Sequence, residues 1–236
     1  MKISVLIVAH NEEEYIGKCL ESILNQSQKP DEIILIAHNC TDKTIQISKN
    51  YPTIKTIEYN GPAGIPYARI KGFEIVNGDI ICCIDGDAYA HKNWLKNIIK
   101  PLIKNNKITI VGGRLIMTNN ILWRLEMIGQ FIRRKFLNDE ISQFASGGNF
   151  ACRKIDYEKV GGIKPIIELK DKLNLYFWAE DYYLSQALRQ IGKFHIAWNA
   201  LVYTKMSPEQ EPIKIQPELI KKWNHDNNAI LNYFKK

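Results

Sequence analysis

The feature that most constrains the fold is an alternation of apolar runs and amphipathic stretches that continues to residue 115. The apolar runs are rich in Ile and Val and are continuous, which is typical of parallel strands buried on both faces. We expect strands at residues 2–10, 30–39, 54–60, 79–85 and 108–115, with helices between them at 11–26, 40–51, 64–78 and 91–105. Strands that alternate with helices over short links form parallel sheets with right-handed crossovers. The first half therefore predicts an α/β fold with a Rossmann-like, mostly parallel central sheet flanked by helices.

The rhythm changes after residue 120, so the second half is expected to be mixed. Residues 120–144 are helix-like without a clean apolar stripe, and 145–163 read as a Gly-rich turn, a short strand and a helix start. A helix at 179–192, a strand at 194–204 and a helix in 217–236 follow. We expect one domain over 1–207, with a half of nucleotide-binding type (1–118), a different second half (119–207) and a C-terminal helical tail (208–236).

The composition is that of a globular protein with an excess of basic residues. Of the 236 residues, 45% are hydrophobic and 24% are charged, and 32 Lys and Arg against 25 Asp and Glu give a net charge of +7. This charge favours an anionic partner, such as nucleic acid, a phosphorylated small molecule or a lipid surface. No segment interleaves aromatic and basic residues as nucleic-acid-binding motifs do, so nucleic acid is not expected.

The cysteines and the N-terminus predict a reducing compartment. The five cysteines are an odd number without a C-x-x-C pair, so we expect buried, reduced thiols rather than disulfides or a zinc site. The apolar run at the N-terminus is short for a signal peptide, and no stretch approaches the ~20 apolar residues of a membrane span. We therefore expect a cytoplasmic protein.

Polar residues follow three of the expected strands, at 10–12, 38–42 and 85–87. Because ligands of doubly wound sheets bind beyond the carboxyl ends of the strands, we expect these segments to converge on one site. The D-x-D pair Asp85 and Asp87 suits Mg²⁺ or Mn²⁺ held against a diphosphate, although Asp-Gly also favours a plain tight turn. No Walker A or G-x-G-x-x-G sequence is present, which disfavours the common ATP and NAD sites.

Six segments follow one another along the chain: AHNEEEYI, DEIILIAHNCTDKT, YARIKG, GDIICCIDGDA, GGNFACRK…VGGI and AEDYYLSQALRQIG. In this order they resemble glycosyltransferase family 2, whose catalytic domain has the GT-A fold, and the resemblance covers about residues 3–207. It implies a GT-A fold whose C-terminal half binds the acceptor. It also implies a transferase dependent on Mn²⁺ or Mg²⁺. Such an enzyme moves a sugar from a UDP- or GDP-linked donor to an acceptor hydroxyl, with inversion at the anomeric carbon.

The resemblance also implies roles for individual residues. The nucleotide-sugar site would comprise Ala9, His10, Asn11, Glu12, His38, Asn39, Arg69, Asp85 and Gly86. The metal ligands would be Asp85 and Asp87, with Asp87 the more direct one. The acceptor side would include Gly147, Gly148, Asn149 and Trp178. Asp181 would be the catalytic base, and Glu180 would support its placement.

Three departures from the family's pattern matter. The acidic positions that usually meet the nucleobase are Ala37 and His38 here, so the identity of the base stays open. The asparagine of the family's A-R-N pattern is Ile70, which removes one polar contact. The Q-x-x-R-W motif of processive members is absent, so transfer of a single sugar is favoured over polymer synthesis.

Structural explanations stand beside several of these roles. Glu180 and Asp181 could simply complement a helix dipole, Gly147 and Gly148 could simply form a turn, and Trp178 could belong to the core.

The histidines and one basic cluster also have two explanations. His195 lies in an apolar strand and is expected to be a core residue rather than a ligand, whereas His10 and His38 could contact the donor. The cluster 133–135 (Arg-Arg-Lys) could be a solvated face. It could also contact the anionic inner face of the membrane, where a lipid-linked acceptor would lie.

Two other classes remain as alternatives to a transferase of this family. A sugar nucleotidyltransferase should carry a Gly-rich, basic loop after the first strand, where this chain has the acidic AHNEEE. A non-catalytic relic would bind nucleotide without turnover, and the intact D-x-D and Glu-Asp pairs argue against it. We therefore expect a metal-dependent inverting glycosyltransferase that acts on a glycan, a lipid-linked or a small-molecule acceptor.

Overall fold

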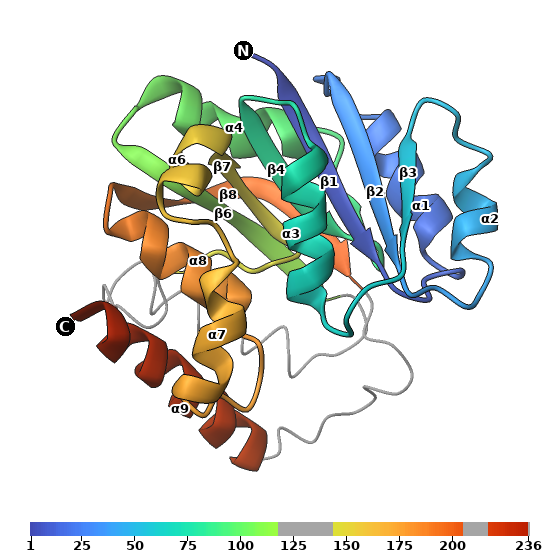
Figure 1. Ribbon diagram of the computed structural model, residues 1–236. Coiled ribbons are helices and arrows are strands. Elements are labelled where there is room, and N and C mark those ends of the chain that lie inside the picture. The colour runs from blue at the N-terminus through green and yellow to red at the C-terminus, as the bar shows by residue number, and fades with distance from the viewer. Residues whose placement is uncertain (118–143, 205–216, 236) are drawn as a thin grey trace.

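The computed structural model describes residues 1–117, 144–204 and 217–235, which form a sheet of eight strands with helices on both faces (Figure 1). The strands are β1 (Ile3–Ala9), β2 (Glu32–His38), β3 (Lys55–Tyr59), β4 (Ile80–Asp85), β5 (Ala88–Ala90), β6 (Ile108–Met117), β7 (Asn149–Arg153) and β8 (Lys193–Thr204). The helices are α1 (Ile16–Leu24), α2 (Thr44–Ser48), α3 (Ile65–Ile75), α4 (Trp94–Lys104), α6 (Lys154–Lys159), α7 (Pro165–Lys172), α8 (Glu180–Arg189) and α9 (Pro217–Lys235).

The sheet has the order β3-β2-β1-β4-β7-β6-β8-β5. Strands β1 to β4 are parallel, which confirms the predicted Rossmann-like half. Strand β7 is antiparallel to both of its neighbours, β4 and β6, and β8 pairs with β6 in parallel. A strand from the second half therefore separates β4 from β6, and one sheet runs through both halves of the chain.

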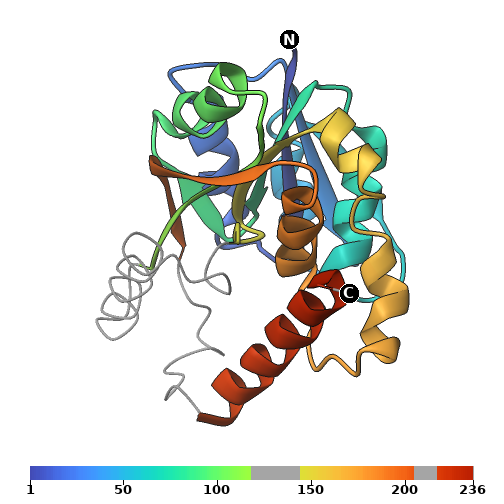
Figure 2. The ribbon, with the colours of Figure 1, turned by 90° about the vertical axis from the view of Figure 1, so that its left-hand side faces the viewer.

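The sheet is buried on both faces because successive residues of its strands point to opposite sides. In β1, Val5 and Ile7 pack in a core with α1 and α4, whereas Leu6 and Val8 pack in a second core with α3 and α8. Figure 1 shows α3 in front of the sheet and α1 and α4 behind it, and Figure 2 shows α9 lying beside α8. Two apolar faces explain why the central strands read as continuous apolar runs.

Two elements were not predicted, and two predictions lie outside the described residues. Helix α7 and the three-residue strand β5 lie where no element was expected. Most of the helix expected at 120–144, with the basic cluster 133–135, falls outside the described residues, and so does the start of the tail. Among the described helices, none is both long and apolar enough to span a membrane.

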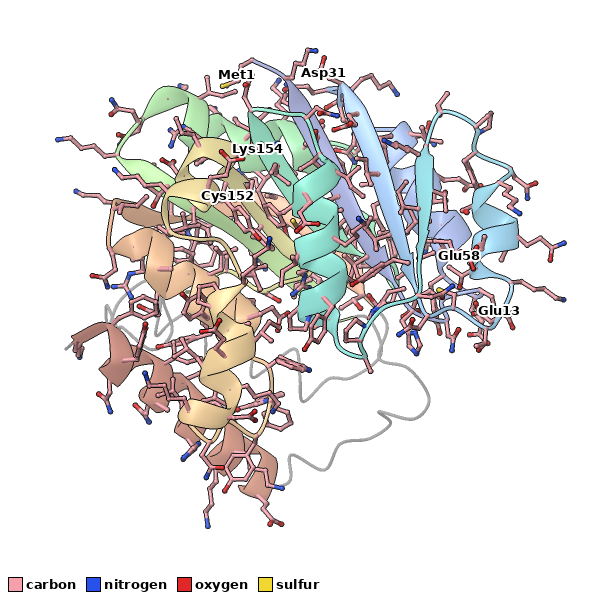
Figure 3. All side chains as sticks on the ribbon, in the orientation of Figure 1. Met1, Glu13, Asp31, Glu58, Cys152 and Lys154 are labelled. Atoms are coloured by element: carbon pink, nitrogen blue, oxygen red, sulfur yellow. The ribbon has the colours of Figure 1, made fainter. Side chains whose placement is uncertain are left out.

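The parallel strands β1, β2 and β4 bring their carboxyl ends to one edge of the sheet. Val8 pairs with Asp85 across β1 and β4, and Ala9 pairs with Ala37 across β1 and β2. Figure 3 shows Met1 and Asp31 at the amino ends of these strands and Glu13 at the opposite end, just after β1. The polar segments 10–12, 38–42 and 85–87 therefore meet at the carboxyl edge, as expected for a ligand site.

Candidate functional site

A cleft of about 350 Å³ opens at this carboxyl edge, within the usual range for small-molecule sites. Its lining comes from the ends of β1, β2 and β4 and from the start of α3. The lining residues are Val8, His10, Glu12, His38, Asn39, Ala63, Gly64, Ile65, Asp85, Gly86 and Asp87. The cleft thus includes most of the residues predicted for the nucleotide-sugar site and both aspartates of the D-x-D pair.

Three carboxylates, those of Glu12, Asp85 and Asp87, crowd one side of the cleft. Burial, and then the charges of Asp87 and Asp85, raise the pKa of Glu12 to about 8. Burial and the charge of Asp85 raise the pKa of Asp87 to about 6, although Thr204 donates a hydrogen bond to Asp87 Oδ2 at 3.1 Å. This side of the cleft therefore carries negative charge that the protein itself compensates only in part.

These carboxylates suit a divalent cation by their chemistry. Carboxylate oxygens are the hard ligands that Mg²⁺ and Mn²⁺ take, and a cation would offset both the burial and the mutual repulsion that raise the two pKa values. Within the described ranges, no cluster of three or more Asp, Glu, His or Cys side chains converges closely enough to enclose a metal ion alone. A cation here would therefore need further oxygens from a ligand, as diphosphates provide.

Two histidines, His10 and His38, also line the cleft. The His38 ring stacks on Tyr59, with ring centroids 5.3 Å apart, and its Nε2 lies 3.0 Å from the Pro62 carbonyl oxygen. His10 Nδ1 lies 2.8 Å from the His38 carbonyl oxygen, so it carries the proton and donates it there. Burial lowers the pKa of His38. Both histidines therefore line the cleft, and at His38 a neutral ring takes the place of an acidic residue.

Two predicted site residues lie beside the cleft rather than in its lining. Ala9 is buried, and a Cβ on Gly86 would come within 2.7 Å of the Ala9 Cβ, so the two strand ends are packed closely. Asn11 has a left-handed backbone (φ 55°), and its Oδ1 accepts a hydrogen bond from the Thr41 N–H at 2.7 Å. Ala9 therefore packs against the lining residue Gly86, and Asn11 links the segment after β1 to the segment after β2.

Arg69 is 2% exposed and is not part of the lining of the cleft. Its Nη2 donates to Asp85 Oδ1 at 2.9 Å, and its Nη1 forms a close ion pair with Glu180 Oε1. Burial lowers the pKa of Arg69, but the attraction of Asp85 and Glu180 outweighs burial and raises the pKa above its ordinary value. Burial raises the pKa of Glu180 to about 7, and the guanidinium opposes that rise.

The Gly-rich turn before β7 packs against Asp85 and the start of α8. The Gly147 N–H donates to Asp181 Oδ2 at 3.0 Å, and the Tyr182 N–H donates to Asp181 Oδ1 at 2.7 Å. A Cβ on Gly148 would come within 2.6 Å of Asp85 Oδ2. The predicted acceptor-side glycines and the predicted base are thus brought together beside the D-x-D strand end.

The other two predicted acceptor residues occupy different surroundings. Asn149 is fully buried and lies outside the lining of the cleft. Its Oδ1 accepts a hydrogen bond from Trp94 Nε1–H at 2.8 Å, and its Nδ2 donates to two backbone carbonyl oxygens. Trp178 is half-buried and packs edge-on against Tyr67, with ring centroids 5.6 Å apart. Its Nε1 would meet a Cβ on Gly64 at 2.7 Å, so Trp178 supports the outer wall of the cleft.

That wall, formed by residues 63–65, was not predicted as part of the site. Gly64 has φ 127°, a conformation open mainly to glycine, and Pro66 follows it at the start of α3. The sequence G-P-A-G-I-P does signal a turn before a helix. It could therefore have identified the turn, but not which strand ends the turn faces.

Comparison with known proteins agrees with this geometry. The family model for glycosyl transferase family 2 matches residues 4–161. The chain is 31% identical over 186 residues to a probable glycosyltransferase of Bacillus subtilis, YdaM, which covers 68% of this chain and 42% of that protein. It is 26% identical over 121 residues to the glucosyl-dolichyl phosphate glucuronosyltransferase of Haloferax volcanii, which covers 49% and 39%. The chain thus spans well under half the length of these two relatives.

Solved structures share the fold. TarS 1–349 of S. aureus in complex with UDP superposes with a TM-score of 0.66 at 21% identity, covering 89% of this chain and 62% of that one. The mannosyltransferase PcManGT of Pyrobaculum calidifontis, in complex with GDP-Man and Mn²⁺, gives 0.66 at 16% identity, covering 89% and 58%. The fold is that of the GT-A glycosyltransferases, as predicted. The chain belongs to glycosyltransferase family 2.

Proposed function

We propose that the chain transfers a single sugar from a nucleoside-diphosphate sugar to an acceptor hydroxyl, with inversion at the anomeric carbon. The observation that carries the proposal is the connection of Asp85, at the cleft, to the Glu180–Asp181 pair through Arg69. An inverting transfer needs a donor site and an acceptor-side carboxylate held next to each other. Membership of the family supports the same conclusion.

Asp87, with Asp85 beside it, would hold Mn²⁺ or Mg²⁺ at the donor. When bound, such a cation offsets the negative charge that develops on the diphosphate as it leaves. The grouping of Glu12, Asp85 and Asp87 in the cleft supports this assignment, because burial and then mutual repulsion raise the pKa values of Glu12 and Asp87, and a cation would offset both effects. The similar mannosyltransferase in complex with GDP-Man and Mn²⁺ supports it as well.

Asp181 is proposed to be the catalytic base. As the acceptor oxygen bonds to the anomeric carbon, the bond from that carbon to the diphosphate oxygen breaks and its electron pair leaves with the diphosphate. The hydroxyl proton passes to the Asp181 carboxylate, since a neutral hydroxyl is a poor nucleophile. The N–H groups of Gly147 and Tyr182 hold the two carboxylate oxygens in one orientation.

The test compares sugar transfer with donor affinity. Asp181→Asn keeps the shape and removes the base, so turnover should fall by about 10²-fold or more while donor binding survives. Glu180→Gln should cost less, because it leaves the base in place. Asp156→Asn serves as the control, because Asp156, on α6, forms an ion pair with Arg153, on β7, away from the cleft. Near-wild-type turnover in Asp181→Asn would refute the assignment.

The donor base, the sugar and the acceptor are proposed only by class. A UDP- or GDP-linked sugar is proposed as donor, and a glycan, a lipid-linked sugar or a small molecule as acceptor. The relative from Haloferax volcanii is named for a dolichyl-phosphate-linked substrate, which supports including lipid-linked acceptors. A thermal-shift panel of UDP, GDP and their sugars with Mn²⁺ would identify the donor class. Contact with a membrane surface through 133–135 stays a prediction.

The two rival classes make different predictions for the same cleft. A nucleotidyltransferase would need a basic loop with Lys or Arg after β1, but the residues of that loop that line the cleft are His10 and the acidic Glu12. A non-catalytic relic would bind the donor without turnover. Release of sugar from the donor, whether to an acceptor or to water, would separate an enzyme from a relic.

A further inference from the structure

Arg69 joins two segments that are far apart in the sequence and adjacent in the site. One nitrogen of its guanidinium donates to Asp85 at the end of β4, and another donates to Glu180 at the start of α8, which is 111 residues from Arg69. Asp85 lines the cleft, whereas Arg69 does not. Arg69 can therefore influence a bound donor through Asp85, and the acceptor side through Glu180.

Stability alone does not account for this arrangement. Burying charges requires removing their hydration, and buried ion pairs are often no more stabilising than apolar residues of similar volume. A guanidinium can, however, hold two carboxylates at once in a fixed plane, which the single ammonium of a lysine does not reproduce. The geometry therefore favours a role in setting the relative position of Asp85 and Glu180.

The Gly147–Gly148 turn packs directly on this guanidinium. A Cβ on Gly147 would come within 2.4 Å of the Arg69 guanidinium nitrogens. The N–H of the same residue donates to Asp181 Oδ2 at 3.0 Å. Asp181 is thus constrained from two sides, through its neighbour Glu180 and through a turn that rests on Arg69.

We infer that Arg69 is a positioning residue, which fixes the first turn of α8, and so Asp181, relative to the strand end that borders the donor cleft. This inference rests on the proposed function. It differs from the role near the nucleotide that the resemblance implies, because Arg69 acts through two carboxylates and not by contact with the donor.

The kinetic test separates turnover from donor binding. Arg69→Lys keeps the charge and loses the two-armed geometry, and Arg69→Met loses both. We expect turnover to fall by about tenfold or more in Arg69→Lys and further in Arg69→Met, since small displacements at a reacting centre can cost about 10²-fold. The dissociation constant of the donor should change by less than about threefold in Arg69→Lys, because Arg69 itself does not contact the donor in this account.

Arg153→Lys is the matched control. Arg153 also ties distant segments together, donating to the carbonyl oxygens of Leu102 and Ile108 and to Asp156, but it lies opposite Ile80 at the far end of β4. Its turnover should match that of the wild type. A loss of donor affinity in Arg69→Lys with turnover retained would overturn the inference, because Arg69 would then serve the donor directly.

A second measurement needs no turnover. In urea unfolding, Asp85→Asn and Glu180→Gln should be non-additive by about threefold or more in the unfolding equilibrium constant, because both partners share Arg69. The same pair of substitutions should become additive in an Arg69→Lys background. Additive effects in the presence of Arg69 would refute the bridge. If the wild type transfers no sugar from any donor, the proposed function fails, and this cycle still decides whether the bridge exists.

Discussion

Gly147 packs closely against the guanidinium of Arg69, and this contact predicts the effect of Gly147→Ala. The added Cβ would lie 2.4 Å from the guanidinium nitrogens, whereas ordinary contact begins at 3.4 Å, so about 1 Å of relief is needed. Arg69 cannot yield freely, because its Nη2 is held at 2.9 Å by Asp85 and its Nη1 by Glu180. A 1 Å shift would break or lengthen a charge-assisted hydrogen bond, worth roughly 1.5–3 kcal/mol. We expect the free energy of unfolding to fall by about 2–3 kcal/mol.

Urea unfolding followed by circular dichroism measures this loss. Gly17→Ala is the matched control, because its added Cβ would meet only ordinary contacts, 3.5 Å from the Tyr51 hydroxyl and 3.8 Å from Ile47. Gly17 is the second residue of α1, where Ala is a better helix former than Gly, so Gly17→Ala should leave stability unchanged or raise it by up to about 1 kcal/mol. If Gly147→Ala is as stable as the wild type, the turn does not pack on Arg69 as described.

Two further predictions concern residues outside the lining of the cleft. Glu32 accepts hydrogen bonds from Ser4 and Asn77, which lower its pKa against the opposing effect of burial. Because its pKa is lowered, the ionised Glu32 stabilises the fold at pH values above its ordinary pKa of 4.5. Glu32→Gln should therefore lower the free energy of unfolding by about 1–2 kcal/mol at pH 7. Urea titrations should show the cost fading as the pH falls below 4.5, and a cost unchanged at low pH would contradict the linkage. Burial raises the pKa of all five thiols, but four of them are buried and Cys40 is only half-buried. Cys40 alone should therefore react with a thiol reagent in the native protein at pH 8, whereas all five cysteines should react after denaturation. Rapid reaction of more than one thiol in the native protein would show that the core is open.

Local patterns were sufficient to predict the first half of the fold. Continuous apolar runs such as 79–85 became buried strands, and the polar residues after them met at one edge, because parallel strands share a direction. The cleft residues Glu12 and Asp87 could be identified for the same reason.

Long-range pairing could not be predicted in the same way. A short strand was expected within 145–163, but no local signal shows that β7 would enter between β4 and β6. Helix α7 was missed although Pro165 opens it and Ile166 and Leu169 share its buried face, since eight residues give a weak periodic signal.

The two ion-pair partners of Arg69 also could not be predicted from the sequence. Its motif placed it near the nucleotide, whereas its charge is matched by Asp85 and by Glu180, which is 111 residues away. A sequence pattern identifies a buried arginine only as improbable, and it does not name the carboxylates that make burial tolerable.

The most direct test of a cation-dependent donor site is calorimetry of UDP and GDP binding, with Mn²⁺ and with EDTA, for the wild type and Asp87→Ala. Asp171→Ala, on the exposed side of α7, controls for loss of a carboxylate elsewhere. We expect one of the two nucleotides to bind the wild type and Asp171→Ala only with Mn²⁺, and to bind Asp87→Ala at least about tenfold more weakly. The assignment of the cleft would be contradicted if the nucleotide bound as tightly in EDTA as with Mn²⁺, and with the same affinity to the wild type and to Asp87→Ala.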